Sequence, residues 1–308
     1  MNSSYLSTLS EKQIHQVQEQ SHALWSDGLS LTDRVTNLKT LMAFSDHLDF
    51  AGLLDDSQNE IVCSLKRYKL HLTDGSGSSI RAIGIGAVFT PEKHRRSGYA
   101  EKLVKCVLAD AGNCGVKAAL LFSDIDPKYY ERVAGFKAFP TWKFTGPVKS
   151  LTSVSPLEIR AAREDDIPWM LEAYDNMWPK NFLRVKRDID SWKFYRLRNA
   201  KEPDLVISQA GRKLGYLTCH KDGAKLFVSE MAAVNANDLN NLWGAVRQVA
   251  IDKNLEHAYG WLAKATIPQQ FMTEQRDSEI AMVTAIDKNF GLETFSVDNS
   301  HFGPMDYF

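Results

Sequence analysis

A short loop between a strand and a helix constrains the fold of this chain more than any other segment. The strand is apolar and runs from Ile80 to Phe89, the loop contains Arg95-Arg-Ser-Gly-Tyr-Ala100, and helically spaced apolar residues follow from Glu101 to Ala111. A second buried strand is predicted over residues 117–123. Such a crossover is right-handed, so the two strands should be parallel. The loop then lies at the carboxyl end of the first strand, where open α/β sheets place their ligands.

The composition of this loop suits a phosphate group. Gly98 and Ala100 are small, so backbone N–H groups at the start of the helix can approach a ligand closely. Unpaired donors and the helix dipole favour an anion there, and Arg95 adds a fixed positive charge. A motif this short is equally typical of a basic helix cap. The neighbouring segments are needed to distinguish a phosphate-binding loop from such a cap.

The order of predicted elements repeats in the two halves of the chain. A hairpin with strands at residues 60–72 and 80–89 precedes the loop, after two or three helices between Ser10 and about Gln58. A new series of strands starts at Leu157, and a predicted helix over 239–252 precedes a last strand at 258–262. We therefore predict an α/β fold with mixed sheets covered by helices on both faces. The predicted domains are residues 1–150 and 151–308.

The overall composition limits the partners of the chain. It has 308 residues, with 37 Lys and Arg against 38 Asp and Glu, a net charge of −1. That charge gives no general attraction to nucleic acid or to an anionic membrane. No apolar stretch approaches the roughly 18 residues of a membrane span, and the N-terminus shows no signal-peptide pattern. We expect a soluble cytoplasmic protein without nucleic-acid or membrane partners, which could form a homo-oligomer.

Two further groups of side chains are interpreted as structural. The four cysteines include no Cys-x-x-Cys pair, so neither a disulfide framework nor a metal site is expected. A basic cluster in the second half is predicted to be the solvated face of a helix; it consists of Lys180, Arg184, Lys186 and Arg187.

The segment from about Ile80 to Phe139 resembles the GCN5-related N-acetyltransferases (GNATs). Their signature joins a strand, an R/Q-x-x-G-x-G/A loop and a later tyrosine element, which here is Tyr129-Tyr-Glu-Arg-Val-Ala-Gly-Phe136. The resemblance implies that the loop holds the pyrophosphate of acetyl-coenzyme A and that the strand end pairs with its pantetheine arm. The implied cofactor residues are Val88, Thr90, Arg95, Arg96, Ser97, Gly98, Tyr99 and Ala100.

The resemblance also implies a general acid. Tyr130 would protonate the departing thiolate. Four residues separate Tyr130 from Gly135, where the family usually has three, so Tyr129 remains an alternative.

Two other segments are similar to particular branches of this superfamily. Residues 121–130 and Ala23-Leu-Trp-Ser-Asp-Gly-Leu29 resemble the fungal lysine N-acetyltransferases. The tandem arrangement and the ending Phe302-Gly-Pro-Met-Asp-Tyr-Phe308 resemble the mycobacterial enhanced-intracellular-survival acetyltransferases, in which the terminal carboxylate enters the active site. The chain is too short for their additional C-terminal domain. The resemblance implies a catalytic carboxylate on Phe308, although a frayed tail is the alternative.

The second half departs from the cofactor-binding pattern. Its strand at 226–233 continues into Val-Asn-Ala-Asn-Asp-Leu-Asn240, which has neither glycine nor arginine. We therefore expect residues 151–308 to form a degenerate GNAT-like domain that scaffolds the site or contacts the substrate.

Transfer of an acetyl group to a primary amine by direct attack is the predicted activity. The preferred acceptor is a small molecule such as lysine or a polyamine, and acetylation of protein lysines or N-termini is the alternative. A non-catalytic coenzyme A sensor or interaction module is the alternative of another class. An amine near pKa 10.4 must lose a proton before it attacks, so a base is expected. The candidates are Glu92, Asp124, Asp126, Glu230 and the carboxylate of Phe308.

Overall fold

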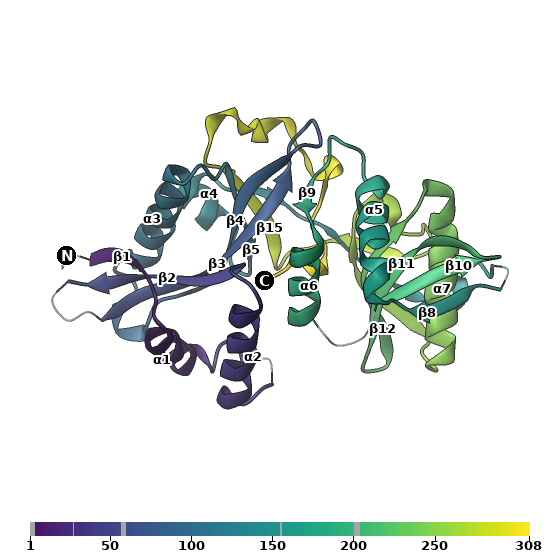
Figure 1. Cartoon of the computed structure of the whole chain (residues 1–308), viewed down its shortest axis with the longest axis horizontal. Helices are drawn as coiled ribbons and strands as arrows, with labels where there is room; N and C mark the ends of the chain where they lie inside the picture. Colours follow the sequence, from purple (N-terminus) through teal and green to yellow (C-terminus); the bar gives the residue numbers. More distant parts are fainter. Residues whose placement is uncertain (1–3, 27, 57–59, 155, 200–203) are drawn as a thin grey trace.

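The computed structural model describes residues 4–26, 28–56, 60–154, 156–199 and 204–308. Expectations that involve Asp27, Gln58 and Ser155 lie outside these ranges. Within them the chain forms two mixed sheets with helices packed on both faces (Figure 1), which confirms the predicted α/β class and the tandem arrangement. No helix in these ranges is long and apolar enough to cross a membrane.

The first sheet is formed mainly by the first half of the chain. Its main path, in spatial order, is β1 (Ser4–Thr8), β2 (Leu48–Asp55), β3 (Ile61–Thr73), β4 (Ser79–Phe89), β5 (Ala118–Ser123), β15 (Ile280–Ala285) and β6 (Lys137–Phe139). Two short strands extend it beside β3, namely β9 (Leu183–Lys186) and β16 (Ser300–His301). β3 and β4 form the predicted hairpin, and β4 and β5 are parallel as expected.

The second sheet has the same central pattern. Its spatial order is β14 (Met272–Gln275), β7 (Trp142–Pro147), β13 (His257–Leu262), β12 (Lys225–Ala233), β11 (Arg212–Asp222), β10 (Leu205–Gln209) and β8 (Glu158–Ala161). β11 and β12 are antiparallel, and β12 and β13 are parallel. This matches β3, β4 and β5 of the first sheet.

Each sheet includes at least one strand from the opposite half of the chain. β7 lies before residue 150 in the sequence but pairs with β13 of the second sheet, whereas β15 pairs with β5 and β6 of the first. The sheets therefore do not divide the chain at residue 150. Because each sheet includes a strand from the opposite part of the chain, backbone pairing connects the two halves.

Helices cover both faces of each sheet. In the first, α3 (Tyr99–Asn113) packs on one face, and α1 (Glu11–Ser21) and α2 (Leu31–Phe44) pack on the other (Figure 1). In the second, α5 (Ile167–Met177) and α7 (Leu239–Asp252) take opposite faces. Side-chain caps define several starts, for example the Ser10 and Gln13 capping box of α1.

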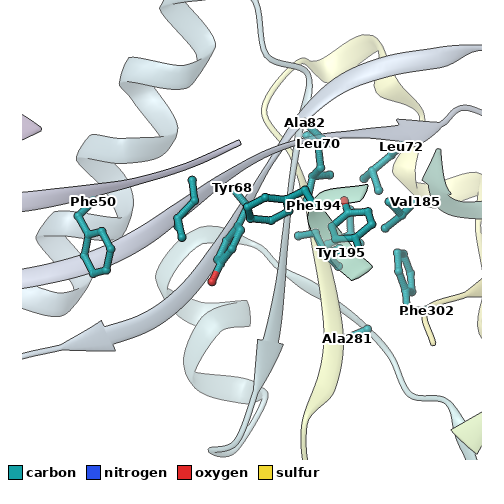
Figure 2. Packing of buried hydrophobic residues seen from close by; sticks show 14 of the residues in the cluster. Phe50, Tyr68, Leu70, Leu72, Ala82, Val185, Phe194, Tyr195, Ala281 and Phe302 are labelled. Carbon is teal, nitrogen blue, oxygen red and sulfur yellow. The ribbon is translucent and has the colours of Figure 1, made fainter. Parts of the chain in front are cut away.

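One helix of the second half belongs to the core of the first sheet. Phe194 and Tyr195 of α6 (Ile189–Arg198) pack with Tyr68 and Leu72 of β3 and with Phe302 near the chain end (Figure 2). The sequence positions of these residues are far apart, yet they form one continuous cluster of buried side chains. This packing brings the end of α6 and the C-terminal segment close to the first sheet.

Two expectations from the sequence are wrong. Residues 48–55, predicted to be helical, form β2; this strand lies between β1 and β3 and is buried along most of its length, so it lacks the alternation of a half-exposed strand. The basic cluster is not a solvated helix face, because Arg184 lies in β9 and only 4% and 5% of Arg184 and Arg187 are exposed. Arg187 pairs with the buried carboxylates of Glu230 and Asp306, and Arg184 lies 3.1 Å from the partly exposed carboxylate of Asp175.

Candidate active site

The end of β4 separates from β5 and opens the first sheet. The two strands pair from Ala82 opposite Ala118 to Ile85 opposite Leu121, and the pairing stops there. On the other side of β4, the register with β3 shifts between Ser64 and Lys66. Ala87 occupies the left-handed region with φ of 46°, which costs a non-glycine residue free energy and is typical of functional sites. This bulge bends β4 away from β5.

A cavity of about 630 Å³ lies in this opening. Residues of the first sheet line it together with residues of helices α1, α2, α3 and α6. Several of the predicted site residues line it together: Val88, Ala100, Tyr129, Tyr130 and Phe308. The volume is in the usual range for small-molecule sites.

The predicted phosphate loop stands at one end of this cavity. Gly98 has φ of 76° and directly precedes α3, and Arg96 is also left-handed with φ of 62°. No heavy atom lies within 4 Å of the place that a Cβ on Gly98 would take, so the loop surface is open. The first N–H groups of α3 have no acceptor inside the helix, and the loop arginines add positive charge. These features fit a pyrophosphate group.

The remaining residues of the loop have more local contacts. Arg95 Nε donates to the Thr90 carbonyl oxygen at 3.3 Å, and the Thr90 hydroxyl lies 3.3 Å from Cys63 Sγ. Ser97 and Tyr99 line a second hollow of about 410 Å³ beside Gly98. Of the two residues predicted to pair with the pantetheine arm, Val88 lines the main cavity and Thr90 does not.

The two tyrosines of α4 (Lys128–Ala134) lie side by side on the cavity wall. Their ring centroids are 5.0 Å apart in an edge-to-face arrangement. Burial raises the pKa of both phenols, and raises that of Tyr130 to about 12. Both hydroxyls therefore carry their protons at neutral pH, as a general acid requires. Gly135 ends the helix with φ of 64°, which turns Phe136 back against Tyr130.

Only some of the candidate bases line the cavity. Asp124 lines the cavity, and burial raises the pKa of its carboxyl group. Glu92 and Asp126 do not line it. Glu230 is only 2% exposed, and its carboxylate binds Arg187 and Tyr216 in a separate buried cluster. The structure thus brings Asp124 and Phe308, but not Glu230, to the tyrosines.

Phe308 lines the cavity. The Phe308 ring lies over Gly84, and its centroid is 4.5 Å from that of Tyr68 and 5.5 Å from that of Phe122. A Cβ placed on Gly86 would lie 3.0 Å from a terminal oxygen of Phe308. The two glycines of β4 therefore leave the space that the last residue occupies.

A buried charge cluster holds the segment before Phe308. Arg187 donates to Glu230 Oε1 at 2.7 Å and to Asp306 Oδ1 at 2.6 Å, and the Arg187 and Asp306 side chains are fully enclosed. Its guanidinium also lies 4.3 Å from the ring centroid of Tyr174. Asp306 Oδ2 accepts from the Gly303 backbone N–H at 3.0 Å. Arg187 thus joins the second sheet to the C-terminal segment.

The corresponding loop of the second sheet has a different structure. Asn235 Nδ2 and both terminal nitrogens of Arg212 donate to the Asp238 carboxylate in front of α7. A carboxylate therefore occupies the helix start at which the first half places Gly98 and its arginines. An anionic ligand would be repelled there.

Some cavity residues had no signal in the sequence. Lys66, Arg198 and Asn199 line the cavity, although Lys66 belongs to a predicted strand and the other two end a helix of the second half. Only the packing of α6 against the first sheet reveals their position.

Comparisons with known proteins agree with this geometry. The model of a family described as "Acetyltransferase (GNAT) domain" matches residues 5–137. The chain resembles the crystal structure of a conserved protein from Enterococcus faecalis, with a TM-score of 0.76 at 15% identity over 95% of this chain and 75% of that one. No protein with a curated description matches the chain in sequence.

Two further structures share the fold. A GCN5-related N-acetyltransferase from Kribbella flavida has a TM-score of 0.72 at 15% identity, over 94% of this chain and 72% of that one. Eis1 from Mycobacterium abscessus has a TM-score of 0.65 at 14% identity, over 98% of this chain and 82% of that one. Both likenesses extend over the two sheets.

Proposed function

Because residues 5–137 match a GNAT acetyltransferase domain and the whole chain shares the fold of GNAT structures, we propose that it acetylates the amine of a small molecule in the cavity beside β4. The supporting observation is that one cavity of about 630 Å³ is lined by the end of the phosphate loop, both tyrosines and Phe308. Use of acetyl-coenzyme A, whose thioester supplies the acetyl group, follows from the family.

The phosphate loop would hold the cofactor. Arg95, Arg96 and the backbone N–H groups from Ser97 to Ala100 would bind the pyrophosphate, since they combine positive charge with open donors at a helix start. Val88 and Thr90 would hold the pantetheine arm at the unpaired end of β4. Removing the Arg95 charge should weaken acetyl-coenzyme A binding without changing the acceptor.

Tyr130 would act as the general acid. Its hydroxyl makes no hydrogen bond within the described ranges and lines the cavity, and burial raises its pKa to about 12, so it holds a proton to give to the departing sulfur. Tyr129 is less buried but reaches the same cavity. Replacing each tyrosine separately distinguishes the two.

The terminal carboxylate of Phe308 would accept the proton of the attacking amine. It lies against Gly86, where β4 bulges, and Arg187 and Asp306 hold the preceding segment from the second sheet. Asp124 is the other carboxylate of the cavity lining. Residues added after Phe308 should abolish turnover while acetyl-coenzyme A still binds; unchanged turnover would exclude this role.

The second half would serve as a scaffold. We propose residues 1–150 as the catalytic GNAT domain and residues 151–308 as a degenerate GNAT-like domain, with β7 and β15 exchanged between them. The degenerate half contributes α6 and the chain end to the cavity, and the Asp238 carboxylate disfavours a second cofactor at its own loop.

A cavity of this volume, walled by several helices, favours a small acceptor over a protein. α1 and α2 contribute to its walls, and the C-terminal residues contribute Tyr307 and Phe308. The test is coenzyme A thiol release by the purified chain with lysine, spermidine, an aminoglycoside or a lysine-containing peptide. Release with a small amine supports the proposal, and release with the peptide alone indicates protein acetylation. Silence with every acceptor, while acetyl-coenzyme A binds, would indicate a cofactor sensor.

A further inference from the structure

Two hydrogen-bond donors of the cavity lining have no acceptor. Arg198 Nη1 and Asn199 Nδ2 are both buried, and neither has a hydrogen-bond partner among the residues that the structure describes. Both side chains line the cavity from the C-terminal end of α6. A buried donor without an acceptor costs roughly 1–3 kcal/mol, and more when it is charged, so a ligand that accepts from both would be favoured.

The rest of the Arg198 side chain is fixed. Nη2 donates to the Met305 carbonyl oxygen at 2.9 Å, and the guanidinium carbon lies 5.3 Å from the ring centroid of Tyr195 and 5.9 Å from that of Tyr68. These contacts orient the guanidinium but leave Nη1 without a partner. Burial lowers the pKa of Arg198, because no carboxylate in the described ranges pairs with the cation.

The charge of the cavity lining points in the same direction. Its cationic side chains are Arg34, Lys66 and Arg198, and its one acidic side chain in the described ranges is Asp124. Arg34 already donates to the Trp25 carbonyl oxygen. Lys66 and Arg198 remain as cations beside Asp124 and the Phe308 carboxylate. A polyamine or an aminoglycoside would add positive charge to this cavity, whereas an amine that also bears a carboxylate would balance it.

We infer that Arg198 and Asn199 form a subsite for a carboxylate of the acceptor, which is therefore an amino acid rather than a simple polyamine. This inference rests on the proposed acetyl transfer and names its substrate class. Arg198 Nη1 and Asn199 Nδ2 donate to the carboxylate, and the amine extends toward Tyr130. The Met305 carbonyl and the two tyrosine rings already orient the Arg198 guanidinium.

The test compares lysine with lysinamide, which differs by an amide in place of the carboxylate. Wild-type chain should acetylate lysine with a kcat/KM roughly 30-fold or more above that for lysinamide, since losing one partner of a buried charged hydrogen bond has about that effect. Arg198→Met should remove the preference, because lysine turnover should fall much further than lysinamide turnover. Asn199→Leu should reduce the preference for lysine by a smaller factor than Arg198→Met does. Lys193→Met, on an exposed part of the same helix, is the control and should retain the preference for lysine.

Calorimetry of lysine and lysinamide binding to the complex of the chain with coenzyme A tests the subsite independently of acetyl transfer. If no amine is acetylated, the proposed function fails, but lysine should still bind more tightly than lysinamide, and only when Arg198 is present. Equal binding of the two ligands would overturn the subsite. An Arg198→Met variant that loses lysine and lysinamide turnover by the same factor would also overturn it, because Arg198 would then act only through the structure.

Discussion

The ring of Phe308 lies directly over Gly84, so that a Cβ on Gly84 would be 2.9 Å from Phe308 Cε1 and closer still to Cζ. A real Cβ cannot approach a ring this closely, so the last residue can occupy the cavity only because β4 has glycine at this position. Gly86, two residues later, makes room for the Phe308 backbone in the same way. The placement of the proposed catalytic carboxylate thus depends on two residues of the central strand.

Replacing Gly84 by alanine should displace Phe308 and lower turnover. The clash involves the far end of a side chain at the chain terminus, which can move without unfolding the sheet. A displaced catalytic group can cost about 100-fold in rate. We expect kcat to fall by about that factor while acetyl-coenzyme A affinity and the melting temperature change little. Gly75→Ala, in the hairpin turn, is the control; equal activity of both variants would contradict the role of Phe308.

Replacing Tyr130 by phenylalanine should remove the general acid. The ring packing against Phe136 is retained, but the proton is lost. General acids contribute about 100-fold or more to rate, so kcat should fall by at least that factor with unchanged acetyl-coenzyme A binding. Tyr129→Phe is the matched variant. If it lowers kcat and Tyr130→Phe does not, the assignment of the two tyrosines must be reversed.

Replacing Arg187 by methionine should destabilise the fold strongly. The change leaves the carboxylates of Glu230 and Asp306 buried without their cation. Breaking such a cluster from one side costs roughly 3–5 kcal/mol. The free energy of unfolding in urea measures the loss. Adding Glu230→Gln and Asp306→Asn to the variant should restore part of the stability, and no recovery would argue against a charge effect.

Stability should fall between pH 6.5 and pH 4 because of His301. Burial lowers the pKa of this imidazole to about 4, whereas it is 6.5 in the unfolded chain. Protons therefore bind the unfolded chain preferentially in this range, so the contribution of His301 is complete above pH 6.5 and decreases as pH falls to 4. The shift corresponds to roughly 3 kcal/mol. His301→Phe can still stack on Trp178. In this variant the midpoint of urea unfolding should depend less on pH over this range, and an unchanged pH dependence would contradict the account.

Local patterns predicted the centre of the first sheet well. The β3 and β4 hairpin, α3, β5 and α4 all have short-range signals: alternation, a glycine turn, helical spacing and a glycine C-cap. The exchange of β7 and β15 could not be predicted, because pairing over more than one hundred residues leaves no local pattern. β2 was missed because its burial on both faces removes alternation.

The candidate site was predictable only in part. The phosphate loop and the tyrosine pair carry a recognisable spacing, so their residues could be named in advance. The sequence around Arg187 predicts a solvated face because basic residues are usually exposed, and only the distant Glu230 and Asp306 explain its burial. Arg198 and Asn199 reach the cavity through the packing of α6 on the first sheet, which depends on tertiary contacts rather than on their own sequence pattern.

The most direct test of acetyl transfer is a single-turnover reaction with the chain in excess over acetyl-coenzyme A. Lysine is present, and mass spectrometry follows both products. We predict one acetylated lysine for each coenzyme A released, with both products forming at least about 100-fold more slowly in Tyr130→Phe. Coenzyme A that forms without acetyl-lysine or another acetylated amine, or acetyl-coenzyme A that stays bound and intact, would contradict the account.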